Sequence, residues 1–149
     1  MKLIQKLSNS SASRSIVLIR LMVGLVFLSE GIQKFLTPET RGVGRFIKIG
    51  LPEPEFLAYF VASFEVVCGS LIVLGLLTRL AVLPTITIML VAIITTKLPQ
   101  LSSAGFWEMA QAARTDFCML LGSIYLLIRG AGPWSLDASI GGKKEEDIA

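Results

Sequence analysis

The stretch that decides the fold is residues 15–36, SIVLIRLMVGLVFLSEGIQKFL. As a helix, an apolar run of this length can cross the hydrocarbon core of a bilayer, which requires about 20 residues. The polar, Ser-rich residues 1–14 before it resemble the first part of a signal peptide. However, the apolar run is too long for the core of a signal peptide, and no A-x-A cleavage pattern ends it. We therefore predict a retained transmembrane helix over 15–36.

Three further apolar segments follow, at about residues 56–77, 80–96 and 114–131. The link between 56–77 and 80–96 is so short that it forces an antiparallel helical hairpin. The last segment reaches spanning length only if it begins in the preceding loop or runs on past its apolar part. Together the four segments predict an all-α membrane protein, a bundle of four transmembrane helices within residues 15–137.

Two longer connections, residues 37–55 and 97–115, lie on the side of the bundle opposite the termini in this prediction. The first is rich in Pro and Gly, and the second contains aromatic residues typical of a short interfacial helix. We expect both connections to lie on the membrane surface and to cap the bundle. Residues 1–14 form a polar N-terminal tail, and residues 138–149 are expected to be a disordered, charged C-terminal tail.

The composition supports one membrane domain whose main partner is the lipid bilayer. Mean hydropathy is +0.71, and charged residues make up 17% of the chain, against about 25% in a typical soluble domain. An even number of spans places both termini on one side. That side collects eight of the 14 Lys and Arg residues, which favours cytoplasmic termini. No basic run is dense enough to indicate nucleic-acid binding.

Histidine is absent from the sequence, and this limits the chemistry available. It excludes histidine-ligated haem, most zinc and copper sites, triad catalysis and histidine proton relays. The two cysteines, Cys68 and Cys118, belong to no C-x-x-C pair and no zinc-type spacing. We predict no metal site and no covalently bound cofactor.

Several ionisable residues fall inside the apolar segments. Such a residue at the bilayer centre costs roughly 2.5–3.5 kcal/mol, so it persists where it faces a protein interior or a wet cavity. The predicted intramembrane polar cluster consists of Arg20, Glu30, Lys34, Glu65 and Asp116. Secondary members are Lys97, Arg114 and Arg79.

Glu65 lies near the middle of its segment, where a carboxylate is either protonated or paired with a cation. The candidate cations are Arg20, Lys34, Lys97 and Arg114, and the expected depth favours Arg20 or Lys34. The outer members of the set could line a shallow polar cavity that opens on the face away from the termini. Two readings stay open: a site for a substrate, quinone or proton, and a salt-bridge network that only fixes helix register.

Spacing predicts which faces of the first two helices meet. Steps of three or four residues place one set on a single face of the first helix: Arg20, Gly24, Phe27, Gly31 and Lys34. A second set aligns on the next helix: Ala58, Ala62, Glu65, Gly69 and Ile72. The small residues on these faces permit close helix approach. We expect Gly24, Gly31 and Gly69 to be packing points.

Three stretches in this order resemble the DoxX family of small four-helix membrane proteins. They are residues 20–35, RLMVGLVFLSEGIQKF; residues 65–79, EVVCGSLIVLGLLTR; and residues 130–137, GAGPWSLD. The resemblance covers about residues 15–137. The family pattern falls on Arg20, Gly31, Lys34, Glu65, Gly69, Thr78 and Arg79, and Asp116 matches an acidic position near the start of the fourth helix.

The resemblance implies a multi-pass protein of the bacterial inner membrane. The family is named after the membrane subunit of a thiosulfate:quinone oxidoreductase, and some members are linked to oxidative-stress complexes. It therefore implies an accessory or membrane subunit of a redox system, with quinone as the ligand and a redox partner protein. Two alternatives stay open: a small proton-coupled transporter, which would need to form a homo-oligomer to build a path, and a structural or assembly protein without catalysis.

Overall fold

The computed structural model describes residues 14–140, so residues 1–13 and 141–149 of the two predicted tails lie outside the described part. Within it the chain is helical and has no strands. In chain order the elements are α2 (Ile16–Leu36), α3 (Val43–Lys48), α4 (Pro54–Leu74), α5 (Thr78–Ala92), the π-helical turn η1 (Ile93–Lys97), α6 (Leu98–Ser103) and α7 (Phe106–Arg129).

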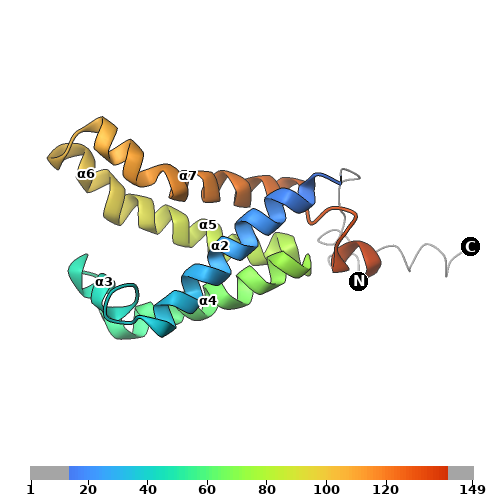
Figure 1. The fold of residues 1–149 in the computed structure, drawn as a ribbon, viewed down its shortest axis with the longest axis horizontal. Helices are drawn as coiled ribbons and strands as arrows, with labels where there is room; N and C mark the ends of the chain where they lie inside the picture. The colour runs from blue at the N-terminus through green and yellow to red at the C-terminus, as the bar shows by residue number, and fades with distance from the viewer. Residues whose placement is uncertain (1–13, 141–149) are drawn as a thin grey trace, which may run out of the picture.

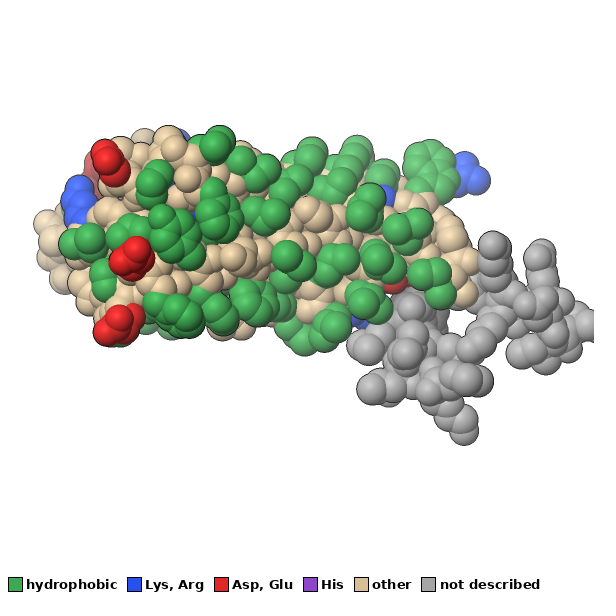
Figure 2. Space-filling view, turned by 90° about the horizontal axis from the view of Figure 1, so that it is seen from below, with side chains coloured by type: hydrophobic (Ala, Val, Ile, Leu, Met, Phe, Trp, Pro, Cys, Tyr) green, Lys and Arg blue, Asp and Glu red, His purple; other side chains and the backbone are tan. Residues whose placement is uncertain are grey.

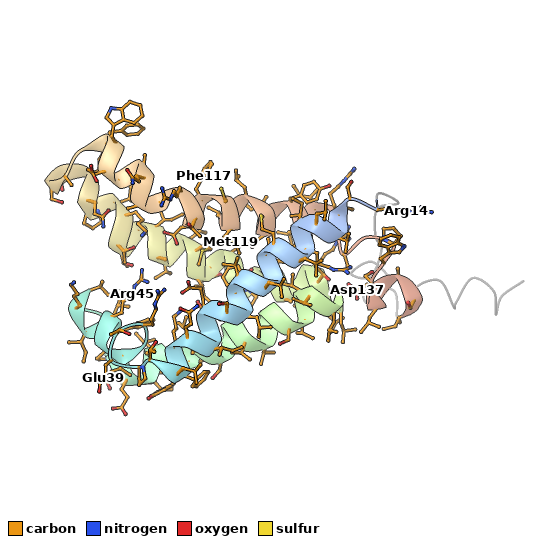
Figure 3. The ribbon with its side chains drawn as sticks, in the orientation of Figure 1. Arg14, Glu39, Arg45, Phe117, Met119 and Asp137 are labelled. Atoms are coloured by element: carbon orange, nitrogen blue, oxygen red, sulfur yellow. The ribbon has the colours of Figure 1, made fainter. Side chains whose placement is uncertain are left out.

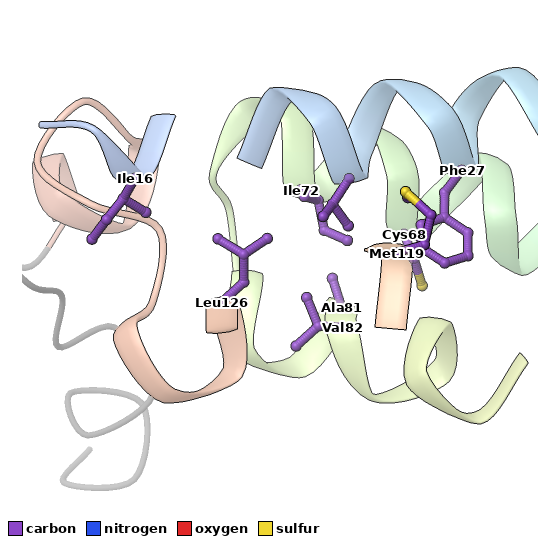
Figure 4. Packing of buried hydrophobic residues seen from close by; sticks show 9 residues of the cluster. Ile16, Phe27, Cys68, Ile72, Ala81, Val82, Met119 and Leu126 are labelled. Atoms are coloured by element: carbon purple, nitrogen blue, oxygen red, sulfur yellow. The ribbon is translucent and has the colours of Figure 1, made fainter. Parts of the chain in front are cut away.

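The long helices form two pairs, α2 with α4 and α5 with α7. Figure 1 shows the pairs meeting near the end where α2 begins and α7 ends, and diverging towards the end that carries α3 and α6. The buried apolar core lies where the pairs meet (Figure 4). It comprises Ile16, Val23, Phe27, Cys68, Ile72, Ala81, Val82, Met119 and Leu126.

Three helices of the described chain are long and apolar enough to cross a membrane: α2, α4 and the continuous helix Thr78–Ser103. This confirms an all-helical membrane protein. At 1.5 Å per residue, the 21 residues of α2 or α4 span about 31 Å, close to the thickness of the hydrocarbon core. Figure 2 shows hydrophobic side chains over the middle of one face, with acidic and basic side chains gathered at the α3 end.

The predicted bounds of the connection at residues 97–115 are wrong. Those residues are helical except at Ala104 and Gly105, where Gly105 has φ 88° and turns the chain. The third helix therefore runs to Ser103, beyond the predicted end near residue 96. The fourth begins at Phe106, before the predicted start near residue 114.

The helix continues past Pro99 because of the π-helical turn that precedes it. Proline lacks an N–H and clashes with the carbonyl of the preceding turn in a regular α-helix. Here η1 widens the helix just before it, and Pro99 falls in the first turn of α6, where a missing N–H is tolerated. The hydroxyl of Thr95 donates to the carbonyl oxygen of Val91 at 2.7 Å within this widened region.

The other predicted connection remains a connection, but it contains a helix. Residues 37–53 link α2 to α4, and α3 lies within them. Pro54 opens α4 at a position that suits proline. At the C-terminal end, residues 136–140 form a helical turn, so the predicted disordered tail does not begin at 138.

Close packing of α2 on α4 depends on glycines. A Cβ placed on Gly69 would lie 2.6 Å from the backbone nitrogen of Leu28, and a Cβ on Gly24 would lie 3.0 Å from the carbonyl oxygen of Gly69. Distances this short leave no room for a methyl group without backbone movement. The two helices therefore approach backbone to backbone, as small residues allow in membrane proteins.

Candidate functional site

A buried ion pair joins α2 to α4. The Lys34 ammonium donates to the Glu65 carboxylate, with Nζ 2.6 Å from Oε2. The two side chains are 9% and 3% exposed, so both charges are shielded from the surroundings by the protein. Of the four cations considered for Glu65, the structure selects Lys34.

Gly31 makes this pairing geometrically accessible. A Cβ at Gly31 would lie 2.9 Å from both the carbonyl oxygen of Ala62 and the Cβ of Glu65. Because the backbone of α2 comes this near to α4 just one turn before Lys34, the lysine reaches Glu65 without leaving the interface. The three glycines predicted as packing points, Gly24, Gly31 and Gly69, all lie in this interface.

Further charges extend from this pair to the surface. Glu30 Oε2 lies 3.8 Å from Lys34 Nζ, and Arg41 Nη1 lies 3.9 Å from Glu30 Oε1. The Glu30 side chain is 38% exposed and that of Arg41 is 51% exposed. The series Arg41, Glu30, Lys34, Glu65 therefore runs from the exposed connection into the buried interface.

α3 adds another cation to this region. Arg45 interacts electrostatically with Glu65. In Figure 3 the Arg45 side chain points from α3 towards the bundle, whereas Glu39 points away from it. The connection between α2 and α4 thus supplies two arginines to the group. Among the described residues, Lys34 alone forms a salt bridge with the Glu65 carboxylate.

Lys97 and Asp116 form a separate pair. Nζ of Lys97, the last residue of η1, lies 3.2 Å from Oδ2 of Asp116 on α7. Both side chains are partly buried. Arg114 is exposed and forms no salt bridge with any residue in the described range.

A third group lies at the opposite end of the bundle, around Arg20. Its Nη1 donates to the carbonyl oxygen of Ala131 at 2.8 Å, in the segment that follows α7. Gly75, which ends α4 with φ 68°, packs against this guanidinium: a Cβ there would lie 2.7 Å from Arg20 Nη1 and 2.5 Å from Ser135 Cβ. The segment after α7 therefore closes over both α2 and the α4–α5 turn.

Asp137 fixes this segment to the start of α5. Its carboxylate accepts hydrogen bonds from the backbone N–H groups of Leu77 at 2.7 Å and Thr78 at 3.1 Å. Its own N–H donates to the carbonyl oxygen of Gly75 at 2.9 Å. The first N–H groups of a helix have no partner within the helix, so Asp137 caps α5 from a distant part of the chain. It also interacts electrostatically with Arg20.

The predicted single cluster is therefore divided into three groups. Lys34, Glu65 and Glu30 lie together, and Asp116 pairs with Lys97 elsewhere. Arg20 is 14 residues from Lys34, about 21 Å along the axis of α2, and serves the opposite end. Of the secondary residues, Arg79 donates through Nη2 to the carbonyl oxygen of Ile128 at 3.0 Å, which joins α5 to α7.

Three residues of these groups had no assigned role in the sequence reasoning. Arg41 and Arg45 lie in a connection. Charged residues are ordinary in such a polar segment, so they do not stand out as they would within an apolar helix. Asp137 stands in the GAGPWSLD stretch after the last helix, and an acidic residue there gives no indication of which helix it caps. Its position in a stretch shared with a family was the one available signal.

The Lys34–Glu65 pair has the donors and acceptors of a small polar binding site. An ammonium carries three N–H donors, of which one goes to Glu65 at 2.6 Å, while Glu30 lies beyond hydrogen-bond distance at 3.8 Å. Among the described residues, no three Cys, Asp or Glu side chains come close enough to hold a metal ion. The Lys34 ammonium therefore has the capacity to donate to a further oxygen acceptor.

Comparison with known proteins gives two relatives and a family. The sequence model of the DoxX family matches residues 15–98. The chain is 51% identical over 138 residues to "Uncharacterized membrane protein Rv3486" of Mycobacterium tuberculosis, covering 89% of this chain and 85% of that protein. It is 33% identical over 144 residues to "Putative oxidoreductase CatD" of Bacillus subtilis, covering 95% and 98% respectively. No solved structure matches the chain.

Proposed function

The chain belongs to the DoxX family of membrane proteins, and from this premise we propose that it is the membrane subunit of a quinone-linked redox system. The Lys34–Glu65 pair is the polar element that carries this proposal. A buried, hydrogen-bonded pair inside apolar helices is costly to maintain, and intramembrane ionisable residues commonly mark ligand or ion sites. The name of the Bacillus subtilis relative, a putative oxidoreductase, supports the redox link.

The Lys34 ammonium suits the head group of a quinone. It retains donor capacity for a carbonyl oxygen beyond its hydrogen bond to Glu65. A bound quinone would supply two-electron redox chemistry that the side chains lack. The part of this chain would be to hold the head group through Lys34, with Glu65 orienting the ammonium through their hydrogen bond.

The proposal includes a topology with four spans. The 24 residues of α7 reach about 36 Å, enough to cross the bilayer. In its N-terminal half, the charge of Asp116 is compensated by the salt bridge to Lys97. With α7 as the fourth span, both chain ends lie on one side. The distribution of Lys and Arg favours the cytoplasmic side of a bacterial inner membrane. Labelling of single cysteines placed at each end, in intact cells and in lysed cells, tests this orientation.

Purification from native membranes in a mild detergent tests the functional proposal. We expect a soluble or membrane-anchored redox protein to co-purify, together with quinone at a stoichiometric level. An unrelated four-helix membrane protein of the same size, prepared from the same membranes, controls for quinone carried over with lipid. A pure chain with no partner, and with quinone no higher than the control, would overturn the proposal.

A further inference from the structure

A groove lies along residues 53–64 at the exposed face of α4, and its lining includes neither Lys34 nor Glu65. It has a volume of about 490 Å³ and begins at the N-terminal end of the helix. Its walls are Phe56, Tyr59, Phe60 and Phe64, with the hydroxyl of Ser63 between them, and its end is formed by Glu53 and Glu55. The groove therefore combines aromatic rings and carboxylates.

Three phenylalanines line the groove as a continuous row. They recur every four residues, with ring centroids 5.7 Å apart for Phe56 and Phe60 and 4.8 Å apart for Phe60 and Phe64. Their exposed fractions fall along the row from 66% to 49% and 39%. From Phe56 to Phe64 the row covers about 12 Å of helix, enough for much of an alkyl chain.

The carboxylates stand at the end of the row nearest the α2–α4 connection. Glu53 and Glu55 are exposed, and neither forms a salt bridge with another described residue. The N-terminus of α4 offsets part of their negative charge. Even so, two neighbouring carboxylates beside aromatic faces favour a cation, because ring faces also attract positive charge. Figure 2 shows acidic side chains at this end of the molecule beside hydrophobic ones.

We propose that this groove binds a membrane-borne amphiphile with an ammonium head group and one alkyl chain. The head lies between Glu53 and Glu55 and over the face of Phe56, while the chain follows Phe60 and Phe64. An anionic head would be repelled by the carboxylates, and a neutral head would lose the attraction to both the carboxylates and the ring. The groove is thus selective for the charge of the head group.

Photoaffinity labelling of the full chain in dodecyl maltoside tests this site. The probes are an alkyl trimethylammonium, an alkyl sulfate and an alkyl maltoside, which share the same photoactivatable chain, and labelled peptides are located by mass spectrometry. We expect saturable labelling within residues 53–64 by the ammonium probe, at least tenfold above the other two. Equal labelling by all three, or ammonium labelling spread over every exposed helix, would overturn the proposal.

Matched variants separate the head-group contact from the chain contact. Glu53→Gln with Glu55→Gln should lower ammonium labelling about tenfold, whereas Glu39→Gln, which alters an acidic residue pointing away from the bundle, should leave it unchanged. Phe60→Ala should weaken labelling, and Phe117→Ala, at an exposed position on α7, should not. All these side chains are exposed, so the variants should keep their helical circular dichroism. Unchanged labelling in the double glutamine variant would contradict the assignment.

Discussion

Lys34 Nζ lies 2.6 Å from Glu65 Oε2 across the glycine-mediated interface of α2 and α4. This contact places one positive and one negative charge in the buried interface of two largely apolar helices. Each charge has the other as its nearest partner. The close approach of the two helices at Gly31 and the Lys34–Glu65 ion pair therefore lie in the same part of the interface.

The first prediction concerns the energetic coupling of this pair. Lys34→Met should lower the free energy of unfolding by about 3–5 kcal/mol, because it leaves Glu65 buried without its cation. Glu65→Gln should cost less, since Lys34 still has Glu30 at 3.8 Å. The double variant should be milder than the sum of the two. Unfolding in mixed micelles by SDS titration measures all four states of the cycle. Strict additivity would contradict the contact.

A second prediction tests the close approach of α2 and α4. Gly69→Ala should destabilise the protein by about 1–3 kcal/mol, because its methyl group would meet the backbone of Leu28. Ser63→Ala on the same helix is the control and should change stability by less than about 0.5 kcal/mol, since Ser63 is exposed. Thermal unfolding in detergent compares the two. Equal melting temperatures of the two variants would show that α2 and α4 can accommodate the methyl group without loss of stability, which would contradict the prediction.

The cap on α5 gives a third prediction. Asp137→Ala should cost about 1–2 kcal/mol, because two backbone N–H groups at the start of α5 lose their acceptor. Asp137→Asn retains one acceptor oxygen and should cost less. The N–H groups of Leu77 and Thr78 should exchange with deuterium faster in the alanine variant, while those in the middle of α4 should not. Unchanged exchange at both positions would exclude the cap.

A fourth prediction concerns the Lys97–Asp116 pair. Lys97→Met should cost about 1 kcal/mol or less, because the pair is only partly buried. Exchange of the two charges, Lys97→Glu with Asp116→Lys, should recover most of the stability lost in Lys97→Glu alone. Arg114→Met, two residues from Asp116 and exposed, is the matched control and should be neutral. Melting temperatures in detergent provide the readout, and failure of the exchange to recover stability would contradict the pairing.

The buried faces of α2 and α4 follow from helical periodicity. Arg20 and Lys34 both lie on the predicted face of α2, and the two helices meet through their glycines. Periodicity assigns a face but not a partner. Arg20 and Lys34 therefore looked equivalent for Glu65, although Arg20 contacts the segment after α7. That segment folds back over 111 residues of sequence separation, which no local pattern encodes.

Helix ends were predicted less well where the local signal was misleading. The aromatic residues within 97–115 indicated a short interfacial helix in a surface connection. In the structure the π-helical turn η1 accommodates Pro99. Contacts between α6 and α7 stabilise the helices on both sides of Gly105. Such contacts override local preference, and they depend on the antiparallel partner helix.

The central claim is that the Lys34–Glu65 pair serves a redox partnership and does not only hold helices in register. The most direct measurement compares wild type with Lys34→Met and Glu65→Met combined, a variant that removes both charges while keeping the interface apolar. Each is purified from native membranes, and quinone and co-purifying protein are quantified per folded chain. We expect a folded double variant with at least tenfold less quinone and partner. A folded double variant that retains both at wild-type levels would contradict it.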